Sequence, residues 1–231
     1  MIYNHKLESA SILAKQLKAT SSNTPNELHL DSNLYIIALK DEHILNTVSK
    51  LNLKNQLIAH TSGTFDTQKL MHFSSRSACF YPMQTLKKDQ NISIDNTAIF
   101  IESNHKKDRD SLKALCQKIK CIPYIIDFEQ RQKIHIAAIA TNNFTYHLFS
   151  CIQEYCKVNN LPYSSLAPLF SQTIKMIEKG NPFTHQTGPA IRRENEILEK
   201  HLELLKNENF LADIYSLFTK QIMKKHQDNE L

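Results

Sequence analysis

The stretch Leu34-Tyr-Ile-Ile-Ala-Leu39, followed by Lys40 and Asp41, decides the fold class of this chain. An unbroken apolar run of this length is typical of a strand in a parallel sheet that is buried on both faces. Asp41 stands where a helix N-cap is expected, and apolar residues recur at helical spacing from Ile44 to Leu51. A buried strand leading into an amphipathic helix predicts an α/β architecture.

Similar patterns surround this unit along the first half of the chain. Strands are expected at 1–3, 56–60, 78–81, 97–101 and 122–126, and helices at 7–19 and 108–119. Strands separated by helices imply right-handed crossovers and a mostly parallel, doubly wound sheet.

The pattern changes at Asp127, whose spacing to Gln130 is that of a capping box. Helical patterns follow to about residue 160, and then over 164–179, 194–206 and 210–225. The sequence therefore predicts an α/β domain over 1–127 and an all-helical domain over 128–231.

The composition excludes several classes of protein. The 231 residues are 41% hydrophobic and 22% charged, which is ordinary for a folded globular chain. No apolar run approaches the ~20 residues of a membrane span, and the first residues lack the layout of a signal peptide. We therefore expect a cytoplasmic protein that does not enter a membrane.

Charge and cysteine content point away from nucleic acid and from metal. The net charge of +5 is spread along the chain rather than clustered with aromatics, so no nucleic-acid partner is expected. The five cysteines include no Cys-x-x-Cys pair, so we expect reduced, buried thiols and no metal site.

Glycine content settles one question about phosphate binding. The three glycines, Gly63, Gly180 and Gly188, cannot form G-x-G-x-x-G or G-x-x-x-x-G-K-[ST]. The sequence thus holds no pyrophosphate loop of the usual dinucleotide-binding kind.

Ligands of open α/β sheets bind beyond the carboxyl ends of the strands. Asn4 and Lys6 follow the first strand. Polar and basic residues at such a strand end favour NADP over NAD as the cofactor. The alternative, equally good, is that Lys6 simply begins an exposed helix. Leu39 ends the second strand. The segment His60-Thr61-Ser62-Gly63 ends the third, where small residues let a backbone approach a ligand closely, or simply form a tight turn.

The long helix carries two polar residues in an apolar stretch. On an uninterrupted α-helix His135 and Asn142 share one stripe, about 10 Å apart along the axis. His135 could polarise a substrate carbonyl or move a proton, and Asn142 could orient the substrate. The alternative is a core histidine with satisfied hydrogen bonds.

The loop Gln186-Thr-Gly-Pro189 leads to a helix start with Arg192 and Arg193. Arginine near a helix N-terminus is electrostatically unfavourable, which suggests that it pairs with a carboxylate or phosphate. Balance by Glu194 and Glu196 is the other explanation.

Several segments in this order resemble one known family. They are 34–41, His60–Gly63, Phe80-Tyr-Pro-Met-Gln-Thr85, 129–144, 186–192 and Lys200-His-Leu-Glu-Leu-Leu205. The chain resembles bacterial Rossmann-like proteins with a C-terminal domain of unknown function 2520, which are similar to the pyrroline-carboxylate reductase and F420-dependent NADP oxidoreductase group.

The resemblance implies an NAD(P)-dependent oxidoreductase of unknown substrate and a homodimer formed by the helical domain. Carried over by position, it places the cofactor (NADP or NAD) on Asn4, Lys6, Leu39, His60, Thr61, Ser62 and Gly63. It places the substrate on Gln84, His135, Asn142, Thr187, Gly188 and Arg192.

Two departures from the family stand out. Its chains begin with a strand, a Gly-x-Gly loop and a helix that this sequence lacks, so we expect an incomplete Rossmann-like domain. We expect the loss to separate strand 34–39 from the later strands and to leave unpaired edges. The chain also has Arg193-Glu194 where the family tends to have Gly-Asp.

Three explanations of the missing unit stay open: a start codon assigned too late, which we favour, a true truncation, or another strand arrangement. The two functional hypotheses are an oxidoreductase that is inactive or incomplete as this chain, and a non-catalytic binding or assembly module. For the chain as given, we predict no measurable NADPH binding.

Overall fold

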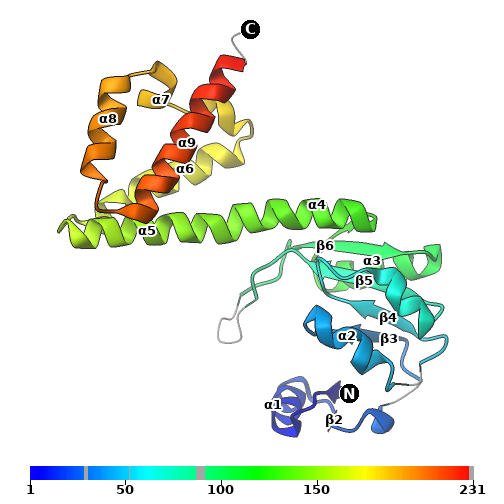
Figure 1. The fold of residues 1–231 in the computed structure, drawn as a ribbon. Helices are drawn as coiled ribbons and strands as arrows, with labels where there is room; N and C mark the ends of the chain where they lie inside the picture. Colours follow the sequence, from blue (N-terminus) through cyan, green and yellow to red (C-terminus); the bar gives the residue numbers. More distant parts are fainter. Residues whose placement is uncertain (29–30, 52, 87–91, 229–231) are drawn as a thin grey trace. The chain divides into compact units, whose positions relative to one another are not determined.

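The computed structural model describes residues 1–28, 31–51, 53–86 and 92–228. The chain forms two compact units, Met1–Ala138 and Ile139–Leu231 (Figure 1). Each unit is described by itself. The boundary lies inside the long helix, because the first turns of that helix are fastened to the α/β unit.

A five-stranded sheet organises the first unit. Its strands lie in the order β3-β4-β5-β6-β7, with the bounds Leu34–Ile37, Leu57–His60, Ser77–Pro82, Ala98–Ser103 and Ile122–Ile125. The pairs β3–β4, β4–β5 and β6–β7 are parallel, and β5–β6 is antiparallel. The mostly parallel, Rossmann-like sheet expected from the sequence is confirmed.

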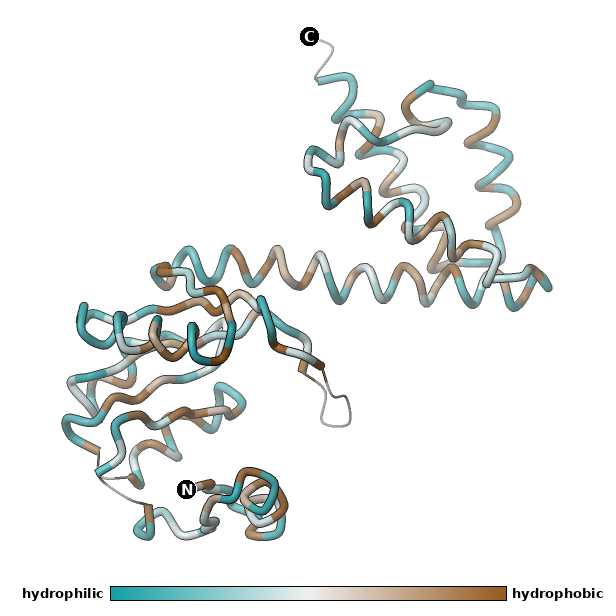
Figure 2. The backbone as a smooth tube through the Cα atoms, turned by 180° about the vertical axis from the view of Figure 1, so that it is seen from behind, coloured by the Kyte–Doolittle hydropathy of each residue, from teal (hydrophilic) through white to brown (hydrophobic). Residues whose placement is uncertain are grey.

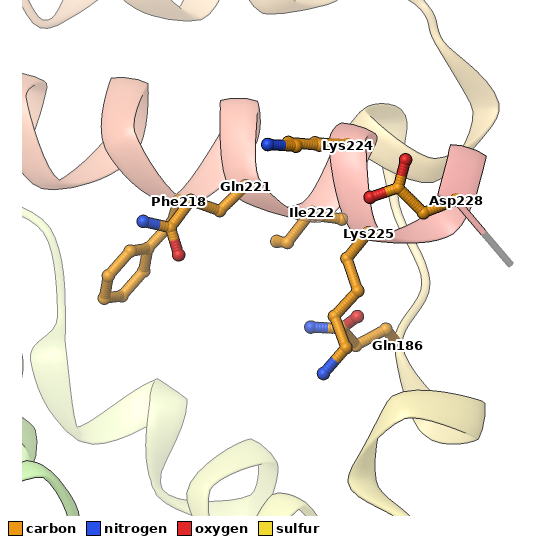
Figure 3. A pocket seen from close by; sticks show the side chains of 7 residues that line it. All are labelled: Gln186, Phe218, Gln221, Ile222, Lys224, Lys225 and Asp228. Carbon is orange, nitrogen blue, oxygen red and sulfur yellow. The ribbon is translucent and has the colours of Figure 1, made fainter.

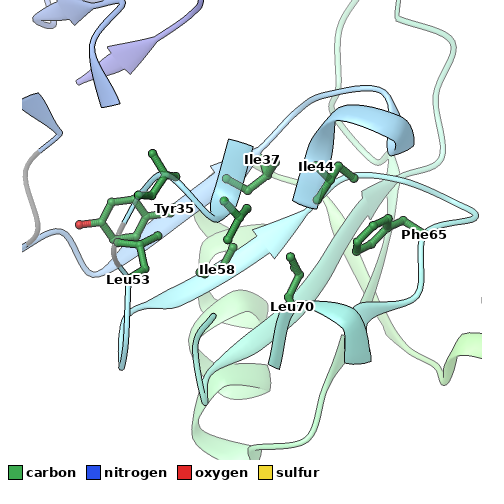
Figure 4. Packing of buried hydrophobic residues seen from close by; sticks show 9 residues of the cluster. Tyr35, Ile37, Ile44, Leu53, Ile58, Phe65 and Leu70 are labelled. Atoms are coloured by element: carbon green, nitrogen blue, oxygen red, sulfur yellow. The ribbon is translucent and has the colours of Figure 1, made fainter. Parts of the chain in front are cut away.

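Two apolar clusters cover the two faces of this sheet. One joins strand residues to α2 (Asp41–Val48) and η2 (Thr67–His72), with Ile58 at its centre and Ile44 and Leu70 fully buried (Figure 4). The other lies under α3 (Lys106–Lys118). Successive side chains of a strand point to opposite faces, so β4 contributes to both clusters and is buried along its whole length.

The strand β3 differs from its expectation. Its Tyr35 and Ile37 are buried, but Ile36 on the other face is 50% exposed. Among the described residues β3 is an outer strand of the sheet, and its second face is covered only in part, by the contact of Leu34 with the second cluster. Asp41 is likewise not the N-cap of α2: Lys40 caps the helix and Asp41 begins it.

The first residues form a sheet of their own. The strands β1 (Ile2–Tyr3) and β2 (Ser21–Ser22) pair in parallel, and α1 (Leu7–Leu17) connects them. The break in pairing therefore falls before β3. The expectation that strand 34–39 would be separated from the later strands was wrong, because β3 pairs with β4 over its whole length.

The helix α4 (Phe128–Ile139) begins at the expected capping box. The amide of Gln130 donates to Asp127 Oδ1 at 2.8 Å, and the amide of Asp127 donates to Gln130 Oε1 at 3.0 Å. The helix continues through a π-helical turn, Ala140–Phe144, into α5 (Thr145–Val158). The sequence predicted an uninterrupted α-helix, and π-helical turns of this kind often occur at functional sites.

The second unit is helical, as expected. After α5 it contains η4 (Tyr163–Leu166), α6 (Ala167–Glu178), η5 (Pro182–His185), α7 (Pro189–Arg192), α8 (Asn195–Leu204) and α9 (Asn209–Asp228). The helix α9 packs against α5, α7 and α8.

Its core is small. The buried apolar side chains among its described residues are Cys156, Ala190, Leu198 and Leu205, and apolar and polar residues are interleaved along its helices (Figure 2). In the described part of the chain, no helix is both long and apolar enough to cross a membrane.

Candidate functional site

The carboxyl ends of β3, β4 and β5 lie at one edge of the sheet, since these strands are parallel. The loop after β4 is tied to the end of β3: the amide of Thr61 donates to the carbonyl of Ile37 at 3.3 Å. The Thr64 hydroxyl donates to Asp41 Oδ2 at 2.6 Å. The segment Thr61–Thr64 is thus held at the position where α/β proteins bind ligands.

His60 shapes this loop from inside. Its side chain is fully buried; Nδ1 accepts from the amide of Ser62 at 3.2 Å, and Nε2 lies 3.0 Å from Thr67 Oγ1. Burial, followed by the charge of Arg131, lowers the pKa of His60 to about 3. The imidazole is therefore neutral, and its fully buried ring supports the loop from inside.

A buried guanidinium fastens the same loop. Arg131, on α4, is 0% exposed. It donates to Glu102 Oε2 at 2.8 Å, to the carbonyl of Ser62 at 2.9 Å and to that of Phe65 at 2.8 Å. A buried charge is stable only when it is paired and hydrogen-bonded. Both conditions are met here by groups far apart in the sequence.

Cys79 on β5 lies under the loop, with Sγ 3.6 Å from the carbonyl oxygen of Ser62. Burial raises the pKa of this thiol to about 12, so it stays protonated and unreactive. All five cysteines are free, and four of them are buried.

His135 and Tyr81 form a hydrogen-bonded pair in the first unit. The Tyr81 hydroxyl lies 2.9 Å from His135 Nδ1, and the two rings meet edge to face. The imidazole also rests on Gly63, where an added Cβ would lie 2.5 Å from His135 Nδ1. The sequence predicted that glycine would allow close approach of a ligand; the group that approaches is His135.

Burial raises the pKa of Tyr81, and the neighbouring Cys79 adds to the rise while Arg131 opposes it. The phenol therefore keeps its proton. From the sequence alone, Tyr81 had no predicted role beyond its place in a motif. Its position at the end of β5, on the face opposite Phe80, is the signal that would have found it.

The predicted site residues divide between the two units. Asn4, Lys6, Leu39, His60, Thr61, Ser62, Gly63, Gln84 and His135 lie in the first, and Asn142, Thr187, Gly188 and Arg192 lie in the second. The structure brings His60–Gly63 and His135 together. Asn4 forms a local turn just before α1, since its Oδ1 accepts from the amide of Lys6 at 2.9 Å.

The π-helical turn changes the relation expected between His135 and Asn142. The shared stripe assumed 100° for each residue, and a π-helix advances by a smaller angle. Asn142 lies within this turn, where its Nδ2 donates to Asn143 Oδ1 at 3.1 Å.

The arginine of the helical loop pairs inside its own unit. Arg192 makes a bidentate ion pair with Glu194, with distances of 2.9 Å and 2.8 Å, so the charge-balance explanation accounts for its contacts. Gly188 has φ 111° at the start of α7, a conformation that favours glycine. Arg193 adopts φ 55°, the left-handed conformation in which the family's glycine is free of strain.

A shallow hollow of about 490 Å³ lies beside the same loop (Figure 3). One side is formed by Gln186 and the other by α9, which supplies Phe218, Gln221, Ile222, Lys224, Lys225 and Asp228. Gln186 Oε1 lies 3.0 Å from Nε2 of His226, which stacks on Phe183. These contacts fasten the Gln186 loop to α9.

Comparison with known proteins identifies the family. The family described as "Domain of unknown function (DUF2520)" matches residues 97–222, more than half of the chain. The chain belongs to this family. A crystallised protein of Bacteroides fragilis, whose proposed activity is that of an NADP oxidoreductase, is 30% identical; the match covers 96% of this chain and 87% of that one, with a TM-score of 0.82.

Two further solved structures share the fold of this DUF2520 protein. A reductive aminase from Aspergillus terreus, crystallised with a nicotinamide cofactor, cyclohexanone and allyl amine, is 12% identical with a TM-score of 0.72. A 1-pyrroline-5-carboxylate reductase from Streptococcus pyogenes is 14% identical with a TM-score of 0.58. The matches cover 98% of this chain in both cases, and 84% and 88% of those chains. No curated protein sequence matches.

Arg131→Ala should destabilise the first unit by about 3–5 kcal/mol, because it leaves Glu102 and two carbonyl oxygens without their buried partner. Urea unfolding measures the change. Lys133→Ala is the matched control: Lys133 pairs with Glu129 on the exposed face of the same helix and should change stability by less than about 1 kcal/mol. Equal effects of the two variants would contradict the conclusion that Arg131 holds the loop after β4 in place.

Gly63→Ala should destabilise the protein by about 1–3 kcal/mol, because the new methyl group overlaps the His135 ring. The double variant Gly63→Ala/His135→Ala should lose less stability than the two single losses added together, because alanine at 135 leaves room for the methyl. A double-mutant cycle of unfolding free energies measures this coupling. Strict additivity would show that the two residues do not press on each other.

Proposed function

We propose that this protein is a cytoplasmic NADP-linked oxidoreductase acting on a small molecule, with His135 as the polar group that faces the reacting atoms. The observation that carries the proposal is the position of the imidazole. It is held against Gly63 at the carboxyl ends of β4 and β5, where proteins of this fold bind ligands. The 30% identity to the Bacteroides fragilis protein supports the choice of cofactor.

The residues of this chain fit the nicotinamide end of such a cofactor. Leu39 offers an exposed apolar side chain, and Thr61–Gly63 offers a small-residue loop whose shape is fixed from below. When bound, a reduced nicotinamide supplies a hydride. The chain's own contribution is a hydrogen bond from His135 that polarises the group accepting the hydride.

The diphosphate end of the cofactor fits less well. Helix N-termini bind phosphate through exposed amides and the helix dipole, but α2 begins with Asp41 and Glu42, whose charges repel it. The start of α1 carries Lys6, which can attract a phosphate at longer range. The reduction itself does not require contacts to the diphosphate, but the affinity for the cofactor depends on them.

The 231-residue chain should therefore bind NADPH weakly, with a Kd of about 1 mM or above, equivalent to about −4 kcal/mol. At millimolar NADPH it should reduce carbonyl or imine compounds, and His135→Asn should lower the rate about 10²-fold or more by removing the polarising group. Loss of NADPH absorbance across a panel of such compounds measures both.

Gln132→Asn is the control for that experiment, because Gln132 lies on the exposed side of the same helix and should leave the rate unchanged. Binding of NADPH at micromolar concentration would overturn the weak-binding prediction. Equal rates for wild type and His135→Asn would overturn the assignment of His135. Absence of NADPH consumption from the whole panel would favour the second hypothesis, a non-catalytic assembly module.

We also propose that the second unit forms a homodimer. Its buried apolar core is small, whereas Ile174 and Ile177 on α6 and Leu217 and Phe218 on α9 are exposed. A second copy of the same chain offers the same apolar faces, which is the requirement of a self-complementary twofold interface. No described residue of α6 or of α9 is buried, so a partner copy would cover faces that the unit itself leaves open.

Ile174→Glu/Ile177→Glu should convert the dimer to a monomer, because two carboxylates would be desolvated in the interface. Light scattering after size exclusion measures the mass; the wild type should have twice the chain mass. Gln172→Glu, on the other side of α6, should remain dimeric. A monomeric wild type at about 100 µM, far above the Kd range of stable complexes, would contradict the proposal.

A further inference from the structure

The hydrogen bond between Tyr81 and His135 has a direction that determines which imidazole nitrogen carries the proton. The two atoms are Tyr81 Oη and His135 Nδ1, 2.9 Å apart. Either Tyr81 donates to an unprotonated Nδ1, or a protonated Nδ1 donates to the phenol oxygen. In the first arrangement Nε2, the nitrogen on the far side of the ring, carries the proton and can donate a hydrogen bond. In the second arrangement Nε2 is unprotonated in the neutral ring and can only accept one.

The surroundings of the phenol favour the first arrangement. If Nδ1 donated, the Tyr81 proton would need another acceptor, and among the described residues the one within reach is Met83 Sδ at 3.9 Å. A thioether is a weak acceptor compared with an imidazole nitrogen. Burial raises the pKa of Tyr81, so the phenol keeps its proton and has that proton to donate.

The ring cannot readily turn to exchange its nitrogens. Gly63 lies against Nδ1, Cγ and Cε1 on one side, and Tyr81 meets the ring edge to face. Tyr81 is itself held by stacking on Phe100. In the described part of the chain, Nε2 has no hydrogen-bond partner, so its group is available to a ligand.

We propose that Tyr81 is a positioning residue that keeps the proton of neutral His135 on Nε2, so that the site takes a substrate whose reacting C=O or C=N heteroatom accepts a hydrogen bond. This inference rests on the proposed function only for the identity of the substrate; the tautomer stands on the geometry alone. In the reduction, the carbon gains the hydride and the heteroatom gains a proton from water. The Nε2–H group stabilises the charge that develops on that heteroatom.

The tautomer can be measured without any cofactor. ¹⁵N-histidine-labelled full-length protein at about pH 8, where ordinary histidines are neutral, should show His135 with Nε2 protonated and Nδ1 unprotonated. Comparison with His135→Asn assigns the signal among the histidines. A wild-type spectrum with the proton of His135 on Nδ1 overturns the proposal directly.

Tyr81→Phe keeps the ring and its stacking on Phe100 but removes the hydroxyl. The tautomer ratio should move by about 2- to 12-fold toward Nδ1–H, which corresponds to the loss of one hydrogen bond. The matched control is Tyr124→Phe, since Tyr124 packs on the other side of Phe100 and is exposed; it should leave the ratio unchanged. An unmoved ratio in folded Tyr81→Phe overturns the proposal.

Turnover distinguishes this inference from the proposed function. If NADPH-dependent reduction occurs, Tyr81→Phe should lower kcat by a similar 2- to 12-fold with little change in the KM for NADPH. Turnover that depends on His135 but not on Tyr81 overturns the positioning role while leaving the function intact. If the protein shows the predicted tautomer but reduces no carbonyl or imine compound, the oxidoreductase proposal is overturned and the tautomer assignment is supported.

Discussion

A buried cation organises the edge of the first unit at which proteins of this fold bind ligands. The Arg131 guanidinium is wholly removed from water and cannot lower its cost by losing its proton, since arginine stays charged in proteins. Its neighbours must therefore supply a carboxylate and several oxygen acceptors in fixed positions, and Glu102, Ser62 and Phe65 supply them. Because Arg131 needs all of these partners, the loop after β4, the end of β6 that carries Glu102 and the first turn of α4 are fixed with respect to one another.

The placement of His135 follows from that anchor. Residues four apart on a helix lie on the same side, so the helix turn that carries Arg131 into the unit also carries His135 toward it. The imidazole then reaches the Ser62–Gly63 loop that Arg131 holds. Glycine at 63 leaves space for the ring, and Tyr81 at the end of β5 meets its Nδ1. An anchored helix and an anchored loop thus position one ring without any contact from a ligand.

The sequence predicted the elements better than their environment. Apolar runs and caps located the strands, the helices and the Asp127 capping box, because these depend on neighbours in the sequence. Burial of β3 on both faces was wrongly expected, since an edge strand and a central strand share the same apolar run and differ only in what covers them. The π-helical turn Ala140–Phe144 has no signal in residue spacing.

The site was predictable in part. His135 stood out because a polar residue interrupted an apolar helix face. Arg131 did not stand out, because it lies between polar residues and its partners lie up to 69 positions away in the sequence. A charged residue in such a context is usually exposed. The role of Tyr81 could be predicted only by knowing which strand ends beside α4. The strand order that decides this depends on the antiparallel pairing of β5 with β6. The alternation of strands and helices in the sequence does not indicate that pairing.

The polar groups around the loop are mostly held in their neutral states, and this limits the chemistry that the site can perform. Burial keeps His60 unprotonated and Cys79 protonated, and the charge of Arg131 is balanced by Glu102. His135 therefore faces a region where the buried charges cancel. A hydrogen bond from an imidazole N–H group is a weak electrostatic interaction in water and a stronger one where water and competing charges are excluded. Such a site can polarise a neutral double bond, whereas binding of a charged part of the substrate requires groups outside this loop.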